Sequence, residues 1–239
     1  MSSTGVLLVA GYTPRSQAYA QALAAAELMP EQAVLLGEPP SSAGATTGES
    51  GRAGELCGLR MADLTIPLRQ TLMDAGVTVH SLDTRDINAA EVVHLLRQLS
   101  PRLIIFSGYG GQIVRPSVLD LGVPVLHVHS GWLPEYRGST TAYYSLLQER
   151  VCAASALLLD PQIDTGPVLA RKRYPAPPQG TDIDRLYDAA MRADLLVEVL
   201  RQYRESGELT VDFQQRPEVG QTYYIIHPVL KHLALLSLP

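Results

Sequence analysis

The chain has 239 residues and a formal net charge of −5 at pH 7, because 24 acidic residues outnumber 19 lysines and arginines. With 46% hydrophobic and 18% charged residues, its composition is that of a globular protein and excludes extended disorder. It has no basic run, which argues against nucleic-acid and anionic-membrane partners, and no apolar stretch nears the ~20 residues that span a bilayer. Only two cysteines are present, and no basic segment precedes the apolar run at 5–10. Both features favour a cytoplasmic protein without a secretory signal.

Short apolar segments alternate with amphipathic segments along the chain. Val6–Val9 is a β-branched and leucine run that predicts a buried strand, and the alanine-rich segment Ser16–Met29 predicts a helix. Gly, Pro, Ser and Thr dominate residues 37–54, and this composition predicts a mobile loop. Asn88 is positioned to cap the N-terminus of a helix over Ala89–Leu99.

The whole alternation predicts an α/β, Rossmann-like fold with a mostly parallel sheet and helices on both faces. The predicted strands are Val6–Val9, Ala33–Leu36, Val77–Leu82, Leu103–Phe106, Val125–His129, Ala154–Leu159 and Val168–Tyr174. The predicted helices are Ser16–Met29, Leu68–Ala75, Ala89–Leu99, Ala142–Leu147 and Ile183–Arg204. We expect a catalytic domain over 1–210 and an apolar extension, 211–239, packed on it. Ligands of such sheets bind beyond the carboxyl ends of the strands.

Two histidines and one acidic residue are the first candidates for chemistry. His127 and His129 lie two residues apart on a predicted strand, so their side chains point to the same side near its carboxyl end. Asp164 lies in a predicted turn between two later strands. A carboxylate that contacts an imidazole fixes its tautomer and raises its basicity, which is the usual way to equip a general base. The spacing alone leaves open whether Asp164 reaches His129.

Three ordered motifs extend this pattern. They are Tyr109-Gly110-Gly111-Gln112-Ile113, then His129 with Leu133-Pro134-x-Tyr136-Arg137-Gly138, then Asp164-Thr165-Gly166. Together they resemble the folate-dependent formyltransferase superfamily, which includes glycinamide ribonucleotide transformylase, methionyl-tRNA formyltransferase and the sugar N-formyltransferases. The resemblance is clear over about residues 101–175. It implies a formyltransferase-type fold and transfer of a formyl group from formyl-tetrahydrofolate to an amine.

The resemblance also implies a role for each catalytic residue. His129 and Asp164 match the family's His and Asp, whereas His127 stands where the family has an Asn that donates a hydrogen bond to the formyl oxygen. Losing such a donor without replacement typically costs about 10²–10³ in rate. An imidazole can replace it with one N–H when neutral and two when protonated. We therefore expect both histidines to stabilise the oxyanion, and Asp164 with His129 to move the amine proton to the folate nitrogen. If His127 acts as a cation, activity falls as pH rises through its pKa.

Binding residues are assigned by the same resemblance. The expected folate contacts are Ser107, Gly108, Tyr109, Gly110, Gln112, Ile113, Asp160 and Ile163. The expected substrate contacts are Gly11, Arg15, Ser16 and Arg137. Arg15 and Ser16 at a helix start are suited to an anion, and Arg137 is suited equally to an anionic acceptor group and to holding its own loop. The expected acceptor is a small amine such as an amino sugar or amino-acid derivative, with a homodimer left open.

Other functions remain open at this point. The same His and Asp residues suit a formyl-tetrahydrofolate hydrolase. His127, His129 and Asp164 also form a 2-His-1-carboxylate set, which is a known metal-binding combination. The exchange of the family's Asn leaves a non-catalytic binding protein as a further alternative. The tyrosine pairs at 143–144 and 223–224 are expected to pack, and the string 223–228 matches no chemical motif.

Overall fold

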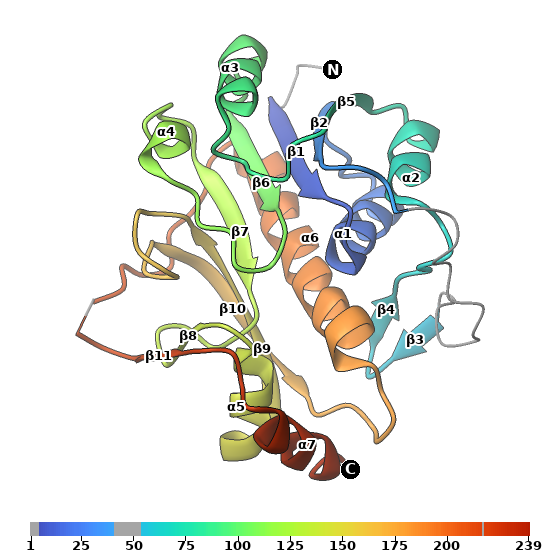
Figure 1. Cartoon of the computed structure of the whole chain (residues 1–239), viewed down its shortest axis with the longest axis vertical. Coiled ribbons are helices and arrows are strands. Elements are labelled where there is room, and N and C mark those ends of the chain that lie inside the picture. Colours follow the sequence, from blue (N-terminus) through green and yellow to red (C-terminus); the bar gives the residue numbers. More distant parts are fainter. Residues whose placement is uncertain (1–4, 41–53, 217) are drawn as a thin grey trace.

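A seven-stranded sheet forms the centre of the molecule, with strand order β10-β9-β7-β6-β1-β2-β5 (Figure 1). The structure is a computed structural model that describes residues 5–40, 54–216 and 218–239. The strands of this sheet are β1 (Val6–Gly11), β2 (Gln32–Leu36), β5 (Thr78–Leu82), β6 (Leu103–Ser107), β7 (Val125–His129), β9 (Val151–Leu158) and β10 (Val168–Pro175). Two small sheets pair β3 (Gly54–Leu56) with β4 (Leu59–Met61) and β8 (Tyr136–Gly138) with β11 (Gln221–Tyr223).

Most neighbouring strands of the large sheet are parallel. β1 pairs in parallel with β2 and β6, β2 with β5, and β6 with β7. β9 is antiparallel to both of its neighbours, β7 and β10. The prediction of a mostly parallel, Rossmann-like sheet is therefore confirmed.

Helices cover both faces of this sheet. They are α1 (Pro14–Ala25), α2 (Leu68–Asp74), α3 (Ala90–Leu99), α4 (Pro116–Leu119), α5 (Thr141–Glu149), α6 (Asp188–Ser206) and α7 (Pro228–Leu236). One hydrophobic core packs α1, α2, α5 and α6 against one face, and a second packs α3 and α4 against the other. All six residues of β1 are buried as a result, which explains why this central strand is a continuous apolar run.

The order of the strands determines where a ligand can bind. From β1 the chain passes to β2 on one side, whereas β6, the other neighbour of β1, is followed by β7 on the opposite side. Ala10 and Ser107 are register partners at the carboxyl ends of β1 and β6. In open α/β sheets such a reversal of strand order leaves a crevice at the carboxyl ends, and ligands bind there.

Several predicted boundaries differ from the structure. α1 ends at Ala25 because Glu27 takes a left-handed conformation and the Leu28 N–H turns back to the Leu23 carbonyl. The predicted helix over 183–204 begins with a π-helical turn, Ile183–Tyr187, before α6. Most of the predicted mobile loop, residues 41–53, lies outside the described residues, and Gly54 begins β3.

The predicted cap at Asn88 is wrong. Ala89 is the N-cap of α3, and its side chain makes no capping hydrogen bond. Asn88 instead donates to the Ile113 carbonyl at 2.9 Å and accepts from the Arg115 N–H at 2.7 Å. These long-range partners, which the local sequence does not reveal, fix the loop that follows β6.

The C-terminal segment lies against the sheet domain. β11 runs parallel to β8, and the Tyr223 ring stacks on the Tyr136 ring with 5.4 Å between centroids. α7 contacts α5 and contributes the buried Ala234 to the core (Figure 1). The division into 1–210 and 211–239 stays a prediction. None of the helices in the described ranges is both long and apolar enough to cross a membrane.

Candidate active site

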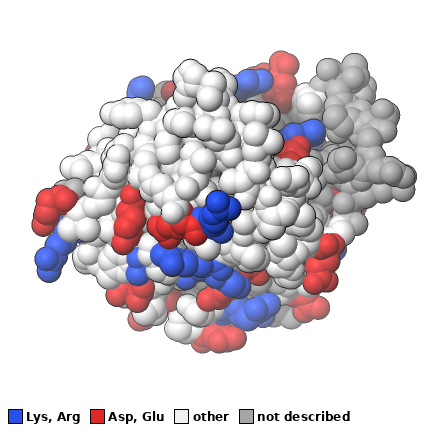
Figure 2. Space-filling view, turned by 90° about the horizontal axis from the view of Figure 1, so that it is seen from below, with Lys and Arg blue, Asp and Glu red and all other residues white. Residues whose placement is uncertain are grey.

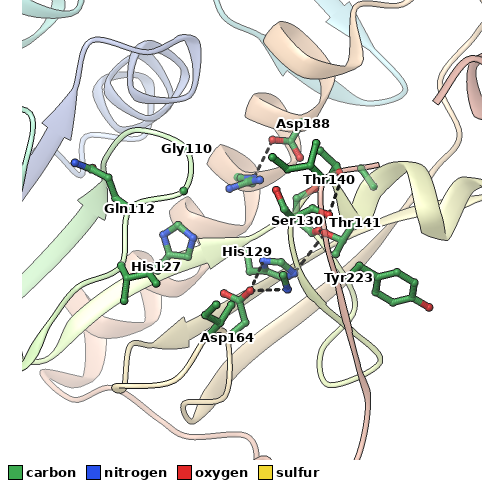
Figure 3. Close-up of a pocket in the computed structure, with 18 of the residues that line it drawn as sticks. Gly110, Gln112, His127, His129, Ser130, Thr140, Thr141, Asp164, Asp188 and Tyr223 are labelled. Carbon is green, nitrogen blue, oxygen red and sulfur yellow. Dashed lines mark hydrogen bonds and ion pairs between the residues drawn. The ribbon is translucent and has the colours of Figure 1, made fainter. Parts of the chain in front are cut away.

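A cavity of about 500 Å³ lies at the carboxyl ends of the parallel strands (Figure 3). Its walls come from the loop after β6, the end of β7, the β9–β10 loop, residues 138–143, the start of α6, and residues 222–225. The predicted site residues that line it are Arg15, Tyr109, Gly110, Gln112, Ile113, His127, His129, Asp160, Ile163 and Asp164. The structure thus brings the two histidines and the distant acid to one cavity.

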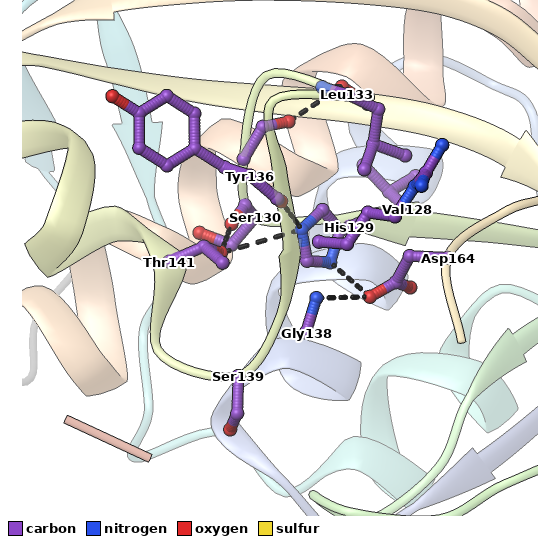
Figure 4. Close-up of polar contacts among 12 residues, drawn as sticks. Val128, His129, Ser130, Leu133, Tyr136, Gly138, Ser139, Thr141 and Asp164 are labelled. Carbon is purple, nitrogen blue, oxygen red and sulfur yellow. Dashed lines mark hydrogen bonds and ion pairs between the residues drawn. The ribbon is translucent and has the colours of Figure 1, made fainter. Parts of the chain in front are cut away.

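Both ring nitrogens of His129 contact acceptors of the protein (Figure 4). Nε2 lies 2.7 Å from the Tyr136 carbonyl oxygen, and Nδ1 lies 3.3 Å from Asp164 Oδ2. A carbonyl oxygen only accepts hydrogen bonds, so Nε2 must carry a hydrogen. The question left open by the sequence is thereby answered, because Asp164 does reach His129. The same geometry leaves His129 without a spare N–H for an oxyanion.

Asp164 is held as a carboxylate. Its Oδ2 also accepts the Gly138 N–H at 2.8 Å, and its backbone has a φ of 54°. Burial opposes ionisation, but His129 and the Gly138 N–H outweigh it, so the pKa of Asp164 lies below its ordinary value. Within the described ranges no group donates a hydrogen bond to Oδ1. This oxygen is therefore available to a ligand in the cavity.

His127 is half-buried in the cavity wall and its Nδ1 lies 3.2 Å from the Phe106 carbonyl oxygen. In the view of Figure 3 its ring lies between the loop that carries Gly110 and Gln112 and the pair formed by His129 and Asp164. Burial, followed by the nearby guanidinium groups of Arg15 and Arg192, lowers the pKa of His127 to about 3. His127 is therefore neutral at physiological pH, and the expectation that it could act as a cation does not fit this site.

Two loops form the opposite walls of the cavity. After β6, Gln112 Oε1 accepts the Tyr109 N–H at 2.8 Å, and Gln112 Nε2 donates to the Arg85 carbonyl. In the β9–β10 loop, Asp160 accepts the Thr165 hydroxyl at 2.8 Å. Both loops are thus fixed by their own polar side chains, and the Asp160 carboxylate holds its loop.

Four predicted contacts lie behind the cavity wall and do not line it: Gly11, Ser16, Ser107 and Gly108. The buried hydroxyls of Ser16 and Ser107 lie 2.8 Å apart and join α1 to β6, so Ser16 is not free to hold an anion. A Cβ on Gly11 would come within 2.7 Å of the Tyr109 ring, and one on Gly108 would overlap the Phe106 ring. The two glycines are needed for close packing beneath the site.

Arg137 also lies outside the cavity. Its buried guanidinium donates to Gln215 Oε1 at 3.0 Å and to the Arg216 carbonyl at 3.2 Å. Gln215 in turn donates to the Asp164 and Gly166 carbonyls. Of the two roles expected for Arg137, these contacts support holding the loop, and a part in binding an anionic acceptor stays a prediction.

The sequence reasoning missed two parts of the wall, at the start of α6 and at residues 222–225. Asp188 and Arg192 lie one turn apart at the start of α6, with 2.9 Å between carboxylate and guanidinium. Their spacing of four residues, with opposite charges, was the available signal. Residues 222–225 reach the cavity because β11 pairs with β8, and the tyrosine pair there gave no chemical signal.

The metal alternative finds no support in this arrangement. Within the described ranges, no group of three or more His, Cys, Asp or Glu side chains is placed to hold a metal ion. His129 would have to give up the Tyr136 carbonyl or Asp164 to become a ligand.

Known proteins resemble this chain in sequence and in structure. A sequence model of the family described as formyl transferase matches residues 7–200. Methionyl-tRNA formyltransferase of Chloroflexus aggregans is 33% identical over 161 residues, which cover 65% of this chain and 50% of that protein. The chain spans about half the length of the curated relatives it matches.

Solved structures share the fold at low sequence identity. A sugar N-formyltransferase from Shewanella sp FDAARGOS_354 superposes with a TM-score of 0.58 at 15% identity, over 97% of this chain and 86% of that one. HypX from Aquifex aeolicus, crystallised in complex with tetrahydrofolic acid, gives a TM-score of 0.54 at 16% identity, over 94% of this chain and 30% of that one. Because the family match covers most of the residues, this chain belongs to the formyl transferase family.

Proposed function

We propose that this protein transfers a formyl group from formyl-tetrahydrofolate to the amine of a small molecule. The observation that carries the proposal is the Asp164 carboxylate, paired with His129 at 3.3 Å and lining the same cavity as His127. A largely buried carboxylate with one oxygen engaged and the other available is equipped to take a proton from an amine. Its place at the reversal of strand order is where this fold binds ligands.

The cavity residues fit a folate donor. Ile113 and Ile163, on opposite loops, are each 50% exposed, although isoleucine side chains are most often buried. Phe106 and Leu159 continue the apolar surface, while Gln112 and Asp160 fix the loop backbones. Apolar walls with a few fixed polar groups suit a flat heteroaromatic ring such as a pterin. HypX, a fold relative, was crystallised with tetrahydrofolic acid.

The proposed chemistry uses the chain's own residues in a fixed order. The folate supplies a formyl group on nitrogen. Asp164 Oδ1 accepts the proton of the attacking amine, while Oδ2 stays bound to the Gly138 N–H and His129. The Tyr136 carbonyl keeps the His129 ring in one orientation throughout. The same carboxyl then returns the proton to the nitrogen that leaves the formyl carbon, so no proton is gained or lost overall.

The charge of the molecule supports a small acceptor. The formal net charge is −5, and Figure 2, which views the end where α5 and α7 lie, shows basic and acidic side chains interspersed around a large uncharged area. A polyanion such as tRNA is held mainly through clusters of lysine and arginine. A second acceptor, methionyl-tRNA, is favoured by the names of the sequence relatives, which are methionyl-tRNA formyltransferases.

One assay tests the donor and the acceptor together. The purified protein is incubated with formyl-tetrahydrofolate and, in separate reactions, a panel of amino sugars and amino-acid derivatives, methionyl-tRNA, or water alone. We expect formylated small amine and tetrahydrofolate in equal amounts. Free formate without an acceptor would identify a hydrolase, and formylation of methionyl-tRNA alone would replace the small amine by tRNA. Absence of folate binding by calorimetry would overturn the proposal.

A further inference from the structure

The hydrogen bond to Phe106 determines which ring nitrogen of His127 carries the hydrogen and which has a free lone pair. Because the Phe106 carbonyl oxygen can only accept, Nδ1 of His127 carries the ring hydrogen in their 3.2 Å contact. The neutral ring then has a bare lone pair on Nε2, which has no hydrogen-bond partner in the described part of the chain. His127 therefore accepts a hydrogen bond from a ligand and cannot donate one to an oxyanion.

The surroundings of His127 keep it in this state. Arg15 faces it from α1 and Arg192 from α6, while Asp164 faces it from the β9–β10 loop and the Phe106 carbonyl from β6. Burial and the two guanidinium groups outweigh Asp164 and the Phe106 carbonyl, so the pKa of His127 falls to about 3. Neither histidine is then a donor for the formyl oxygen, since both nitrogens of His129 are also engaged.

Arg15 is held beside His127 by the same strand end. Three consecutive residues at the end of β6 and in the turn after it hold the two side chains. The Phe106 carbonyl accepts from His127. The Ser107 hydroxyl accepts from Arg15 Nε at 3.2 Å, and the Gly108 carbonyl accepts from Arg15 Nη2. In the described residues, Nη1 of Arg15 has no hydrogen-bond partner. This nitrogen supplies donors at the cavity wall, next to the imidazole that cannot supply one.

Arg15 is also a cation, on which the charge of Asp188 acts without forming an ion pair. Four carboxylates line the cavity, and in the described part of the chain none of them forms an ion pair with Arg15. Their partners lie elsewhere: Asp188 pairs with Arg192, Asp164 with His129, Asp184 with Lys231, and Asp160 accepts from Thr165. Burial lowers the pKa of Arg15 to about 10, which still leaves it charged at neutral pH. A half-buried cation that forms no ion pair is stabilised by any negative charge that develops beside it.

We propose that Arg15 binds the formyl oxygen as it becomes an oxyanion, and that His127 Nε2 accepts an N–H of the attacking amine. The donor role expected from the family's Asn thus falls to a guanidinium, and the imidazole adds an acceptor for the amine. This inference rests on the proposed function. As the amine nitrogen bonds to the formyl carbon, the carbonyl electron pair moves to the oxygen beside Arg15. Asp164 takes one amine proton and delivers it to the folate nitrogen when the old carbon–nitrogen bond breaks.

The first test needs no substrate. In NMR spectra of protein labelled with isotopic nitrogen in its histidine rings, the His127→Asn variant identifies the His127 signals by their loss. We expect a protonated Nδ1 and an unprotonated Nε2 that stay unchanged between about pH 8 and pH 5, because the folded pKa lies well below this range. A ring that carries its hydrogen on Nε2, or that titrates near its ordinary pKa, would overturn the acceptor role of His127.

The second test compares Arg15→Gln and Arg15→Lys with Arg97→Gln, a control on the exposed surface of α3 that removes the same charge. For Arg15→Gln we expect kcat to fall about 100–1000-fold, with the KM of the amine and the dissociation constant of a folate analogue nearly unchanged. Arg15→Lys keeps the charge and should recover part of the loss. Thermal unfolding of each variant checks that the fold is retained.

The outcomes separate this inference from the proposed function. A raised KM for the amine with kcat retained would make Arg15 a binding site for an acceptor anion and would overturn the oxyanion role. An unchanged kcat would overturn it as well. If the unmodified protein transfers no formyl group from formyl-tetrahydrofolate, the proposed function fails and the role of Arg15 fails with it. The histidine spectra still decide the state of His127 in that case.

Discussion

Replacement of Asp164 by Asn tests the proposed proton transfer with the smallest change of shape. Oδ2 of Asp164 accepts the Gly138 N–H at 2.8 Å and contacts His129 Nδ1 at 3.3 Å. The carboxylate oxygen accepts the Gly138 hydrogen and forms the ion pair with His129. If an amide oxygen takes this place, the Gly138 contact survives but the charge is lost; if the amide nitrogen takes it, the Gly138 N–H loses its acceptor.

The two costs of this substitution differ in kind. A hydrogen bond to a charged group contributes roughly 1.5–3 kcal/mol, so Asp164→Asn should lower the free energy of unfolding by about that amount. Domains of this size have stabilities of about 5–15 kcal/mol, and the variant should therefore remain folded. Loss of a general base costs about 10²–10⁴ in kcat, which corresponds to about 3–5 kcal/mol in the barrier. Activity should fall far more than stability.

The assay measures both quantities on the same preparations. Formyl transfer gives kcat, urea unfolding gives stability, and calorimetry with a folate analogue shows whether the cavity is intact. The matched control is Asp74→Asn, which removes the same charge from an exposed site on α2, where Asp74 accepts a hydrogen bond from Gln70. The reasoning is refuted if Asp164→Asn keeps kcat within about tenfold of the unmodified protein while still binding folate. It is also refuted if the control loses as much activity.

Three further predictions concern stability and binding. The unfolded chain takes up a proton at His127 near pH 6.5 but the folded chain only near pH 3, so the free energy of unfolding should fall as pH drops between these values. Urea unfolding of the His127→Asn variant should show a shallower fall over the same pH range. Equal slopes for the variant and the unmodified protein would contradict the assigned pKa. Gly138→Ala should lower the free energy of unfolding by about 1–3 kcal/mol, because φ is 97° there and a Cβ would overlap the Tyr223 carbonyl oxygen. Increased amide exchange at 221–223 would locate the damage, and unaltered exchange would argue against it. Ile113→Ser and Ile163→Ser should each weaken a folate analogue about tenfold or more in calorimetry, since burial of such a side chain contributes roughly 1.5–3 kcal/mol; an unchanged dissociation constant would remove these walls from the folate site.

Local sequence patterns were sufficient for the scaffold and for part of the site. Apolar runs such as β6, bounded by turn residues, identify buried strands because the period of the side chains and their burial are local properties. Alternation of strands and helices leads to a parallel sheet, since right-handed crossovers leave few other arrangements. The two-residue spacing of His127 and His129 placed them on one side of a strand, and both line the cavity. The order of the three motifs identified Asp164 as a candidate site residue.

Only the tertiary structure determines which side-chain atoms carry hydrogens and which groups they contact. Whether His127 donates or accepts depends on the Phe106 carbonyl and on Arg15 and Arg192, which come from three separate elements. The same holds for Asn88, whose side chain fixes Ile113 and Arg115 instead of capping its own helix. A hydrogen bond or an electrostatic interaction acts over a few ångströms in space, whatever the separation along the chain, so the sequence could supply these groups but not the distances between them.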